Sequence, residues 1–306
     1  VHWQERSRAL EDKLSDALHE RLTQRFVDRR AAVLVRRLAG GGELLGAVTR
    51  SGEVLVEGEF VGLLAGFHFT PDRVERGDDT RSLMQAAQRV LQSEIDHRLN
   101  RLERADDAAF TLCDDGALLW DDVPIARLVP GAAILKPRVA ALGSDLLDNE
   151  ERQRIRRRLE NWLEAHLASH LGPLHGLAEA DIRGPARGIA YQLTEALGVV
   201  PRRQVRPQVA ALSEADRQVL TRLGVRIGTE SLYMPVLFRA RTARLTLILW
   251  RISMSSAAGE AARPPQGLLS FAAEPGVPES FYAALGYRSV GGRAVRADRL
   301  ESLAAE

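Results

Sequence analysis

The residues best suited to bind a polyanion are two groups of arginines in the last third of the sequence. One group follows Pro201, and the other flanks the expected start of a later element. A guanidinium makes forked hydrogen bonds to phosphate, and the backbone amides at a helix start also point outward. We therefore predict phosphate contacts at Arg202, Arg203, Arg206, Arg239, Arg241 and Arg244. The alternative interpretation is a solvated surface in an arginine-rich proteome.

Two other sets of side chains have spacings that could support metal binding. His166 and His170 lie four residues apart on an expected helix, a spacing that can place two imidazoles on one metal. Because no third ligand of known placement accompanies them, we assign no metal site. Pairs of adjacent aspartates, which could hold Mg²⁺, occur at 78–79, 106–107, 114–115 and 121–122. They fall at expected turns or helix starts, where aspartate is favoured for local hydrogen bonding.

The sequence lacks the motifs of the common hydrolytic enzymes. Only two lysines occur, and neither Lys13 nor Lys136 precedes the Ser or Thr that a nucleotide-binding P-loop requires. No Gly-x-Ser-x-Gly nucleophile elbow and no His-Glu-x-x-His zinc helix occurs either. We expect no catalytic residue and no cofactor in this chain. An unrecognised hydrolase that uses the aspartate pairs is the least favoured alternative.

Composition narrows the class of protein further. The 306 residues include 42 Lys+Arg and 41 Asp+Glu and are 45% hydrophobic, a mixture typical of one or two globular domains. No apolar run approaches the roughly 20 residues that cross a bilayer, so we expect no membrane partner. The single Cys113 excludes an internal disulfide, which favours a cytoplasmic location. Because an amphipathic pattern is under way soon after Val1, we expect a piece of a longer polypeptide.

Three long amphipathic helices are predicted, and two β-rich stretches lie between them. Apolar residues recur at the helical period over 6–38, 79–104 and 149–171. The β-rich stretches, 43–70 and 108–135, resemble each other at an offset of 64 residues, so that Gly52 matches Gly116 and Val61 matches Ile125. Each is expected to form three strands joined by tight turns. The predicted fold class is therefore α+β, mainly helical, with two duplicated three-stranded modules and a small α/β C-terminal subdomain.

Charge and composition divide the chain into three predicted domains. Residues 1–172 form a helical domain that contains the two β modules, 173–256 a basic helical domain with a short hairpin, and 267–306 a small helix and β-wing subdomain. Residues 1–182 carry a net charge of −6, whereas residues 183–306 carry 17 Lys+Arg and 10 Asp+Glu, a net charge of +7. A polyanion is therefore expected to bind the C-terminal part.

Several segments resemble the C-terminal half of large bacterial DExH-type helicases akin to the mitochondrial degradosome RNA helicase. In that family they lie beyond the two RecA-like motor domains. The segments are KLSDALHERLTQRFVDRR (13–30), GPARGIAYQLTEALG (184–198), LGVRIG (223–228), LYMP (232–235), FYAALGY (281–287) and GGRAVR (291–296). They span nearly the whole chain and occur in this order.

This resemblance implies an ATP-dependent helicase parent, a nucleoside triphosphate hydrolase that acts on RNA, or alternatively DNA. The chain would be its accessory C-terminal region, and ATP and Mg²⁺ would bind the RecA-like domains upstream. The P-loop, the DExH box and the arginine fingers of the family are missing here, so no catalytic residue is transferred. The region would bind nucleic acid or dock a protein partner. The alternative, from a different class, is a non-enzymatic protein-interaction scaffold.

Overall fold

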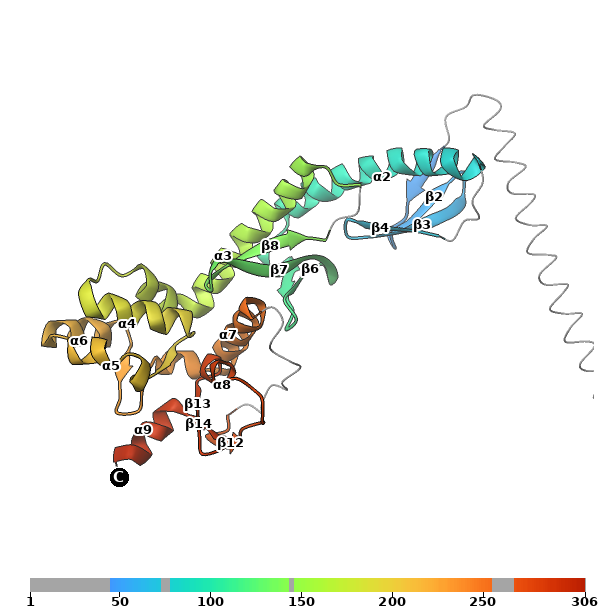
Figure 1. Cartoon of the computed structure of the whole chain (residues 1–306). Helices are drawn as coiled ribbons and strands as arrows, with labels where there is room; N and C mark the ends of the chain where they lie inside the picture. The colour runs from blue at the N-terminus through green and yellow to red at the C-terminus, as the bar shows by residue number, and fades with distance from the viewer. Residues whose placement is uncertain (1–44, 73–77, 143–145, 255–266, 306) are drawn as a thin grey trace, which may run out of the picture. The chain divides into compact units, whose positions relative to one another are not determined.

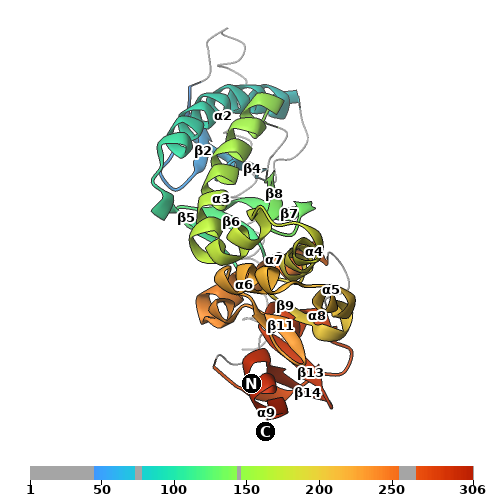
Figure 2. The same cartoon turned by 90° about the vertical axis from the view of Figure 1, so that its left-hand side faces the viewer.

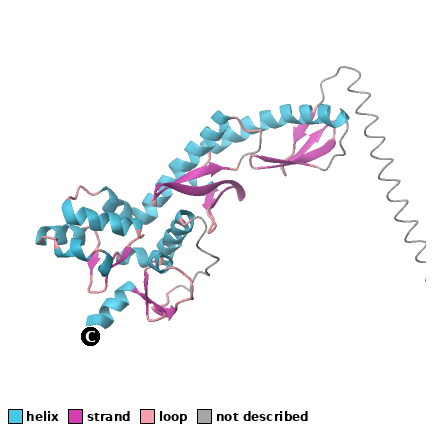
Figure 3. Cartoon of the chain, viewed as in Figure 1, coloured by secondary structure: helices cyan, strands magenta, loops and turns pink. Residues whose placement is uncertain are grey.

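A computed structural model describes residues 45–72, 78–142, 146–254 and 267–305 (Figure 1). The helix predicted over 6–38 lies outside these residues. Helices and small antiparallel sheets alternate along the described chain, which confirms the predicted α+β class (Figure 3). The chain divides into two compact units, one of Val1–Arg101 with Gly143–Asp148 and one of Leu102–Leu142 with Asn149–Glu306. None of the described helices is long and apolar enough to cross a membrane.

Unit 1 contains a four-stranded antiparallel meander that packs against a helix. The strands β1 (Gly46–Val48), β2 (Glu53–Val56), β3 (Glu59–Ala65) and β4 (His68–Pro71) are hydrogen-bonded in sequence order. The helix α2 (Asp78–Arg104) contributes Ala87 and Leu91 to a core that also holds Val54 and Val61 from the sheet. The Arg98 guanidinium donates to the carbonyl oxygen of Gly66 at 2.7 Å and ties this helix to the β3–β4 turn.

Unit 2 begins with a second meander of the same order. Its strands are β5 (Phe110–Leu112), β6 (Ala117–Trp120), β7 (Val123–Ala133) and β8 (Lys136–Ala141), and β8 contacts the helix α3 (Asn149–Glu179). The helix extends beyond the predicted end at 171, through Gly172 and Pro173. Leu171 leaves helical dihedral angles there, with φ −112° and ψ 20°. Pro173 therefore falls in the first turn after a kink, where its missing N–H costs little.

The two meanders share their strand order and the position of a register shift, so the predicted repeat of the two β-rich stretches is found in the structure. A register shift lies between Val54 and Leu55 in one sheet and between Leu118 and Leu119 in the other, at the predicted offset of 64. The hydrogen bond from Leu64 N to Gly52 O, 2.7 Å, has its counterpart from Leu128 N to Gly116 O, 2.8 Å.

Each sheet has four strands, one more than predicted. The fourth strands have four and six residues, and the second of them contains Pro137 and lies beyond the predicted boundary of its module at 135. These segments become strands because they are hydrogen-bonded to the preceding strand, and their sequence alone shows no clear strand pattern. The extra strand gives each sheet a wider face for its helix.

The rest of unit 2 consists of short elements. The first set is α4 (Gly184–Glu195), β9 (Val199–Pro201), α5 (Arg206–Ala210), α6 (Glu214–Arg222), β10 (Arg226–Ile227) and β11 (Ser231–Tyr233). The second set is α7 (Ala240–Ser253), β12 (Ser270–Ala272), α8 (Glu279–Ala284), β13 (Tyr287–Val290), β14 (Arg293–Arg296) and α9 (Ala297–Ala305). The apolar run 245–250, whose composition also suits a strand, lies within the helix α7.

Candidate nucleic-acid interface

The six arginines predicted to bind phosphate fall into two classes. The side chains of Arg206, Arg239 and Arg241 are exposed, and none makes a hydrogen bond or ion pair within the part of the chain that the structure describes. The other three are held by acceptors of the protein itself. Arg203 pairs with Glu279 at 2.9 Å, and Arg202 donates to the carbonyl oxygen of Gly228.

The last of the six, Arg244, is the most firmly held. It forms an ion pair with Asp114 and donates to the carbonyl oxygen of Leu112 at 2.8 Å, so it joins α7 to the second meander. The structure does not bring the six arginines together into one cluster: Arg202 and Arg203 lie between β9 and α5, Arg206 is the first residue of α5, and the others lie at α7. Each group is nevertheless at a helix start, as expected.

A helix-turn-helix surrounds the first group. Three residues, 211–213, separate α5 from α6, the turn length typical of this motif. Ser213 begins α6: its hydroxyl accepts from the Asp216 amide at 3.1 Å, and the Asp216 carboxylate accepts from the Ser213 amide at 3.0 Å. The Ser213 hydroxyl also donates to the Asp216 carboxylate at 2.7 Å, and this hydrogen bond together with the one from the Ser213 amide holds the pKa of Asp216 below its ordinary value. The Arg217 guanidinium donates to the carbonyl oxygen of Val209 at 3.0 Å and fixes one helix against the other.

The surrounding elements extend this motif to a winged helix-turn-helix. The order helix α4, strand β9, helices α5 and α6, and hairpin β10–β11 is that of a winged helix, and the sheet order β10-β11-β9 agrees with it. The helix α4 contacts α5, α6 and β9 (Figure 2). Buried Ile189, Leu193, Val209 and Leu220 fill the space between the helices. The wing is the hairpin β10–β11 with its turn at 228–230.

Sequence reasoning missed three further exposed arginines on this winged helix. Arg187 lies on α4, Arg222 at the end of α6 and Arg226 on β10, and none has a side-chain partner in the described parts of the chain. The sequence analysis expected helices and a short hairpin in this region, and α4, α6 and the hairpin β10–β11 are found there. It did not identify β9 and α5, because elements of three and five residues are too short for a period to show. The order of elements can be recognised as that of a winged helix only when β9 and α5 are included.

The other candidate sites of the sequence have local structural roles. Asp107 pairs with Arg158 and Asp115 with Arg127, at 2.8 and 2.9 Å. The rings of His166 and His170 lie 4.6 Å apart, and Trp162 stacks on His166. Burial lowers the pKa of His166, with smaller contributions from His170 and Arg244. The residues that the structure describes contain no group of three His, Cys, Asp or Glu side chains able to hold a metal.

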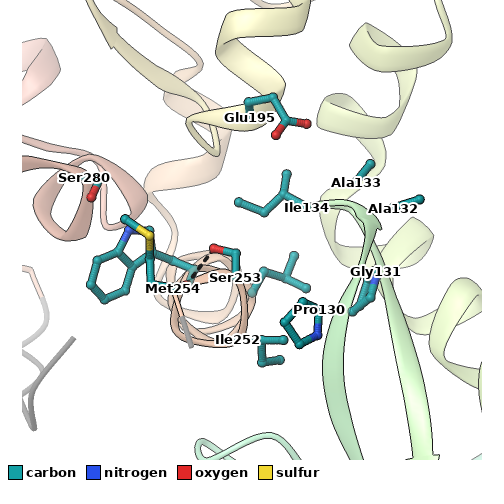
Figure 4. Close-up of a pocket in the computed structure, with 13 residues that line it drawn as sticks. Pro130, Gly131, Ala132, Ala133, Ile134, Glu195, Ile252, Ser253, Met254 and Ser280 are labelled. Carbon is teal, nitrogen blue, oxygen red and sulfur yellow. Dashed lines mark hydrogen bonds between the residues drawn. The ribbon is translucent and has the colours of Figure 1, made fainter. Parts of the chain in front are cut away.

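One pocket of about 340 Å³ lies between the β7–β8 hairpin, the end of α7 and α8 (Figure 4). Its apolar lining comes from Pro130 to Ile134 on the hairpin, from Ile252 on α7 and from Met254 just after that helix. Its polar lining side chains include those of Glu195, Ser253, Ser280 and Trp250, and the Ser253 hydroxyl donates to the backbone of its own helix. Among these lining residues no serine is paired with a histidine, so the pocket does not resemble a nucleophilic active site.

Comparisons with family models, curated proteins and solved structures returned no match to this chain.

Proposed function

We propose that this chain is the accessory C-terminal region of an ATP-dependent RNA helicase and that it holds nucleic acid through its winged helix-turn-helix and the start of α7. The observation that carries the proposal is the set of exposed arginines whose side chains make no hydrogen bond or ion pair with the residues that the structure describes. They are Arg187, Arg206, Arg222, Arg226, Arg239 and Arg241. Guanidinium groups that no carboxylate neutralises remain available to phosphate, and phosphate contacts supply most of the affinity for nucleic acid in the absence of base recognition.

The same surface argues against base-specific binding. The exposed side chains of α6 carry no net charge, because the only charged ones among them are Glu214 and Arg222. The set is Glu214, Ala215, Gln218, Thr221 and Arg222. A-form RNA also has a major groove too deep and narrow for a helix to read. Aromatic residues make up 5% of the sequence, too few for a base-stacking platform. The proposed mode is therefore weak binding of single-stranded RNA by its phosphates, with DNA as an alternative ligand.

ATP hydrolysis belongs, in this proposal, to RecA-like domains upstream in the same polypeptide. Those domains would bind ATP and Mg²⁺, and the cytoplasm is the expected location. The accessory region would keep the strand in place while the motor moves. The resemblance of six ordered segments to the helicase family supports this assignment.

A second candidate function, protein docking, is favoured by exposed apolar side chains in unit 1. Phe60 and Leu63 lie on β3 and are 44% and 42% exposed, and Leu45 just before β1 is 76% exposed. Contiguous exposed apolar patches are typical of surfaces that contact another protein, and these three side chains belong to one module. In that case the chain would act as a scaffold.

Salt dependence distinguishes the two functions. Fluorescence anisotropy of a labelled single-stranded RNA should show an affinity that falls steeply with ionic strength, because each phosphate contact releases counterions. RNAs of different base composition should bind equally. Absent binding, or binding that does not change with salt, would favour the docking alternative.

A further inference from the structure

The turn of the wing holds a carboxylate from the far end of the chain. Glu301, on α9, accepts five hydrogen bonds there. Its donors are Thr229 N at 2.6 Å, Ser231 N at 2.7 Å, Thr229 Oγ1 at 2.9 Å, Glu230 N at 3.0 Å and Ser231 Oγ at 3.1 Å. Three successive backbone amides that converge on one anion form a nest, the arrangement that binds phosphate in other proteins.

The turn is built to admit an anion closely. A Cβ on Gly228 would overlap the carboxyl group of Glu301, so glycine is required for this approach. Ser231 is fully buried, and its hydroxyl and amide both donate to the carboxylate. Burial raises the pKa of Glu301, but the hydrogen bonds from Thr229, Ser231 and Glu230 outweigh it, so the pKa lies below its ordinary value. The turn therefore stabilises the charged form of its occupant.

An exposed arginine and a fixed backbone accompany the anion-binding turn. Arg226 is exposed on β10, the strand that leads into the turn, and has no side-chain partner in the described residues. Arg202 donates to the carbonyl oxygen of Gly228 and holds the turn in place. Backbone amides and hydroxyls are common donors to the phosphates of nucleic acids, where they set the position of the protein on the strand.

We propose that the wing turn is a phosphate-binding site, that Glu301 fills it as an internal substitute for a phosphate, and that a backbone phosphate of the bound RNA displaces it. The identity of the anion as part of an RNA rests on the proposed function. In this arrangement α9 competes with nucleic acid for the wing. The competition is reversible, because it exchanges one set of hydrogen bonds to an oxyanion for another.

The start of α9 stays in place when Glu301 leaves the turn. Ala297 is fully buried and packs with Val199 and Ala283, and the Arg296 guanidinium pairs with Asp298 at 2.7 Å. A variant without the Glu301 carboxylate should therefore keep its fold. The amides of the turn that donated to it are then open to solvent or to an added anion.

The variant Glu301→Ala tests the proposal, and Glu230→Gln is its matched control. The control removes one negative charge from the same turn but leaves the nest filled, since only the backbone amide of Glu230 contacts Glu301. In NMR titrations with inorganic phosphate, the amides of residues 229–231 should shift saturably in E301A, at much lower phosphate concentrations than in E230Q and the wild type, where Glu301 competes for the turn. In the anisotropy assay E301A should bind single-stranded RNA about tenfold more tightly than E230Q, the gain expected for one charge-assisted contact.

Two further variants show whether the gain in RNA affinity comes from the emptied anion site or from another consequence of removing the Glu301 side chain. Glu301→Gln keeps the shape of the side chain and one acceptor oxygen, so its RNA affinity should lie between those of the wild type and E301A. The double variant G228A/E301A places a methyl group where the anion sits, so it should lose both the amide shifts and the tenfold gain.

Absent amide shifts in E301A with phosphate would overturn the anion site itself. Amide shifts without a gain in RNA affinity over E230Q would overturn the assignment of that anion to RNA. The proposed function is tested separately, with the wild-type protein. It fails if the wild type does not bind RNA or if its RNA affinity does not change with salt.

Discussion

At the scale of single residues, the partner of each arginine decides its role. Arg202, Arg203 and Arg244 meet the same sequence criterion as Arg206, but each is held by an acceptor from another element. The acceptor of Arg244, Asp114, is 130 residues away in the sequence. No local pattern reveals such a pair, so the sequence could identify the basic segments but not the arginines that remain available.

Replacing Arg202 by alanine should therefore affect stability more than RNA binding. The change removes a part-buried guanidinium donor, so the carbonyl oxygen of Gly228 loses this hydrogen bond. Loss of such a hydrogen bond costs about 1 kcal/mol of unfolding free energy. Chemical denaturation should show this loss, while the slope of log affinity for RNA against log salt stays at the wild-type value. A reduced slope with unchanged stability would instead make Arg202 a phosphate contact.

The Glu301 carboxylate should make stability depend on pH. Its pKa is lower in the folded state than in the unfolded chain, so its contribution is fully present above the ordinary glutamate pKa of about 4.3. The contribution is lost as the pH falls through the folded-state value. The stability difference between the wild type and E301Q, measured by thermal unfolding, should therefore shrink as the pH falls below about 4. A difference that grows on acidification contradicts the assigned hydrogen bonds.

At the scale of elements, the helices and strands with a clear hydrophobic period were predicted from the sequence, and the shortest elements were not. The helices predicted over 79–104 and 149–171 are found at Asp78–Arg104 and Asn149–Glu179. The repeat at an offset of 64 located both meanders because its turn glycines and inward positions recur. The fourth strand of each sheet, β9 and α5 have three to six residues and little pattern, and packing decides their structure. The winged helix therefore emerged only from the structure.

The turn glycines of the first meander should differ in their tolerance of alanine. Gly52 and Gly58 both have positive φ, 86° and 83°, which costs a non-glycine residue roughly 1–2 kcal/mol. A Cβ at Gly52 would also lie 2.5 Å from the carbonyl oxygen of Leu64, whereas Gly58 has nothing within 4 Å. Gly52→Ala should thus lower the unfolding free energy more than its control Gly58→Ala. Equal losses in urea denaturation contradict the close approach in this turn.

At the scale of the whole molecule, the uneven distribution of charge is the basis for proposing that the C-terminal part binds nucleic acid. Residues 183–306 carry a net charge of +7 and residues 1–182 a net charge of −6. The isolated chain should not hydrolyse ATP above background, with or without RNA, because no phosphate-cradling loop with its lysine occurs in the sequence. A phosphate-release assay measures this. Turnover that is abolished by a substitution within the chain contradicts the assignment.

The most direct test of the central claim is the triple variant R206A/R239A/R241A in the RNA anisotropy assay across salt concentrations. Its control is R50A/R156A/R157A, which removes the same charge from exposed arginines outside the proposed interface. The account predicts that the first variant binds more weakly and that its slope of log affinity against log salt falls by about 0.7 for each lost phosphate contact. The control should keep the wild-type slope. Equal slopes for the two variants would contradict the proposed interface.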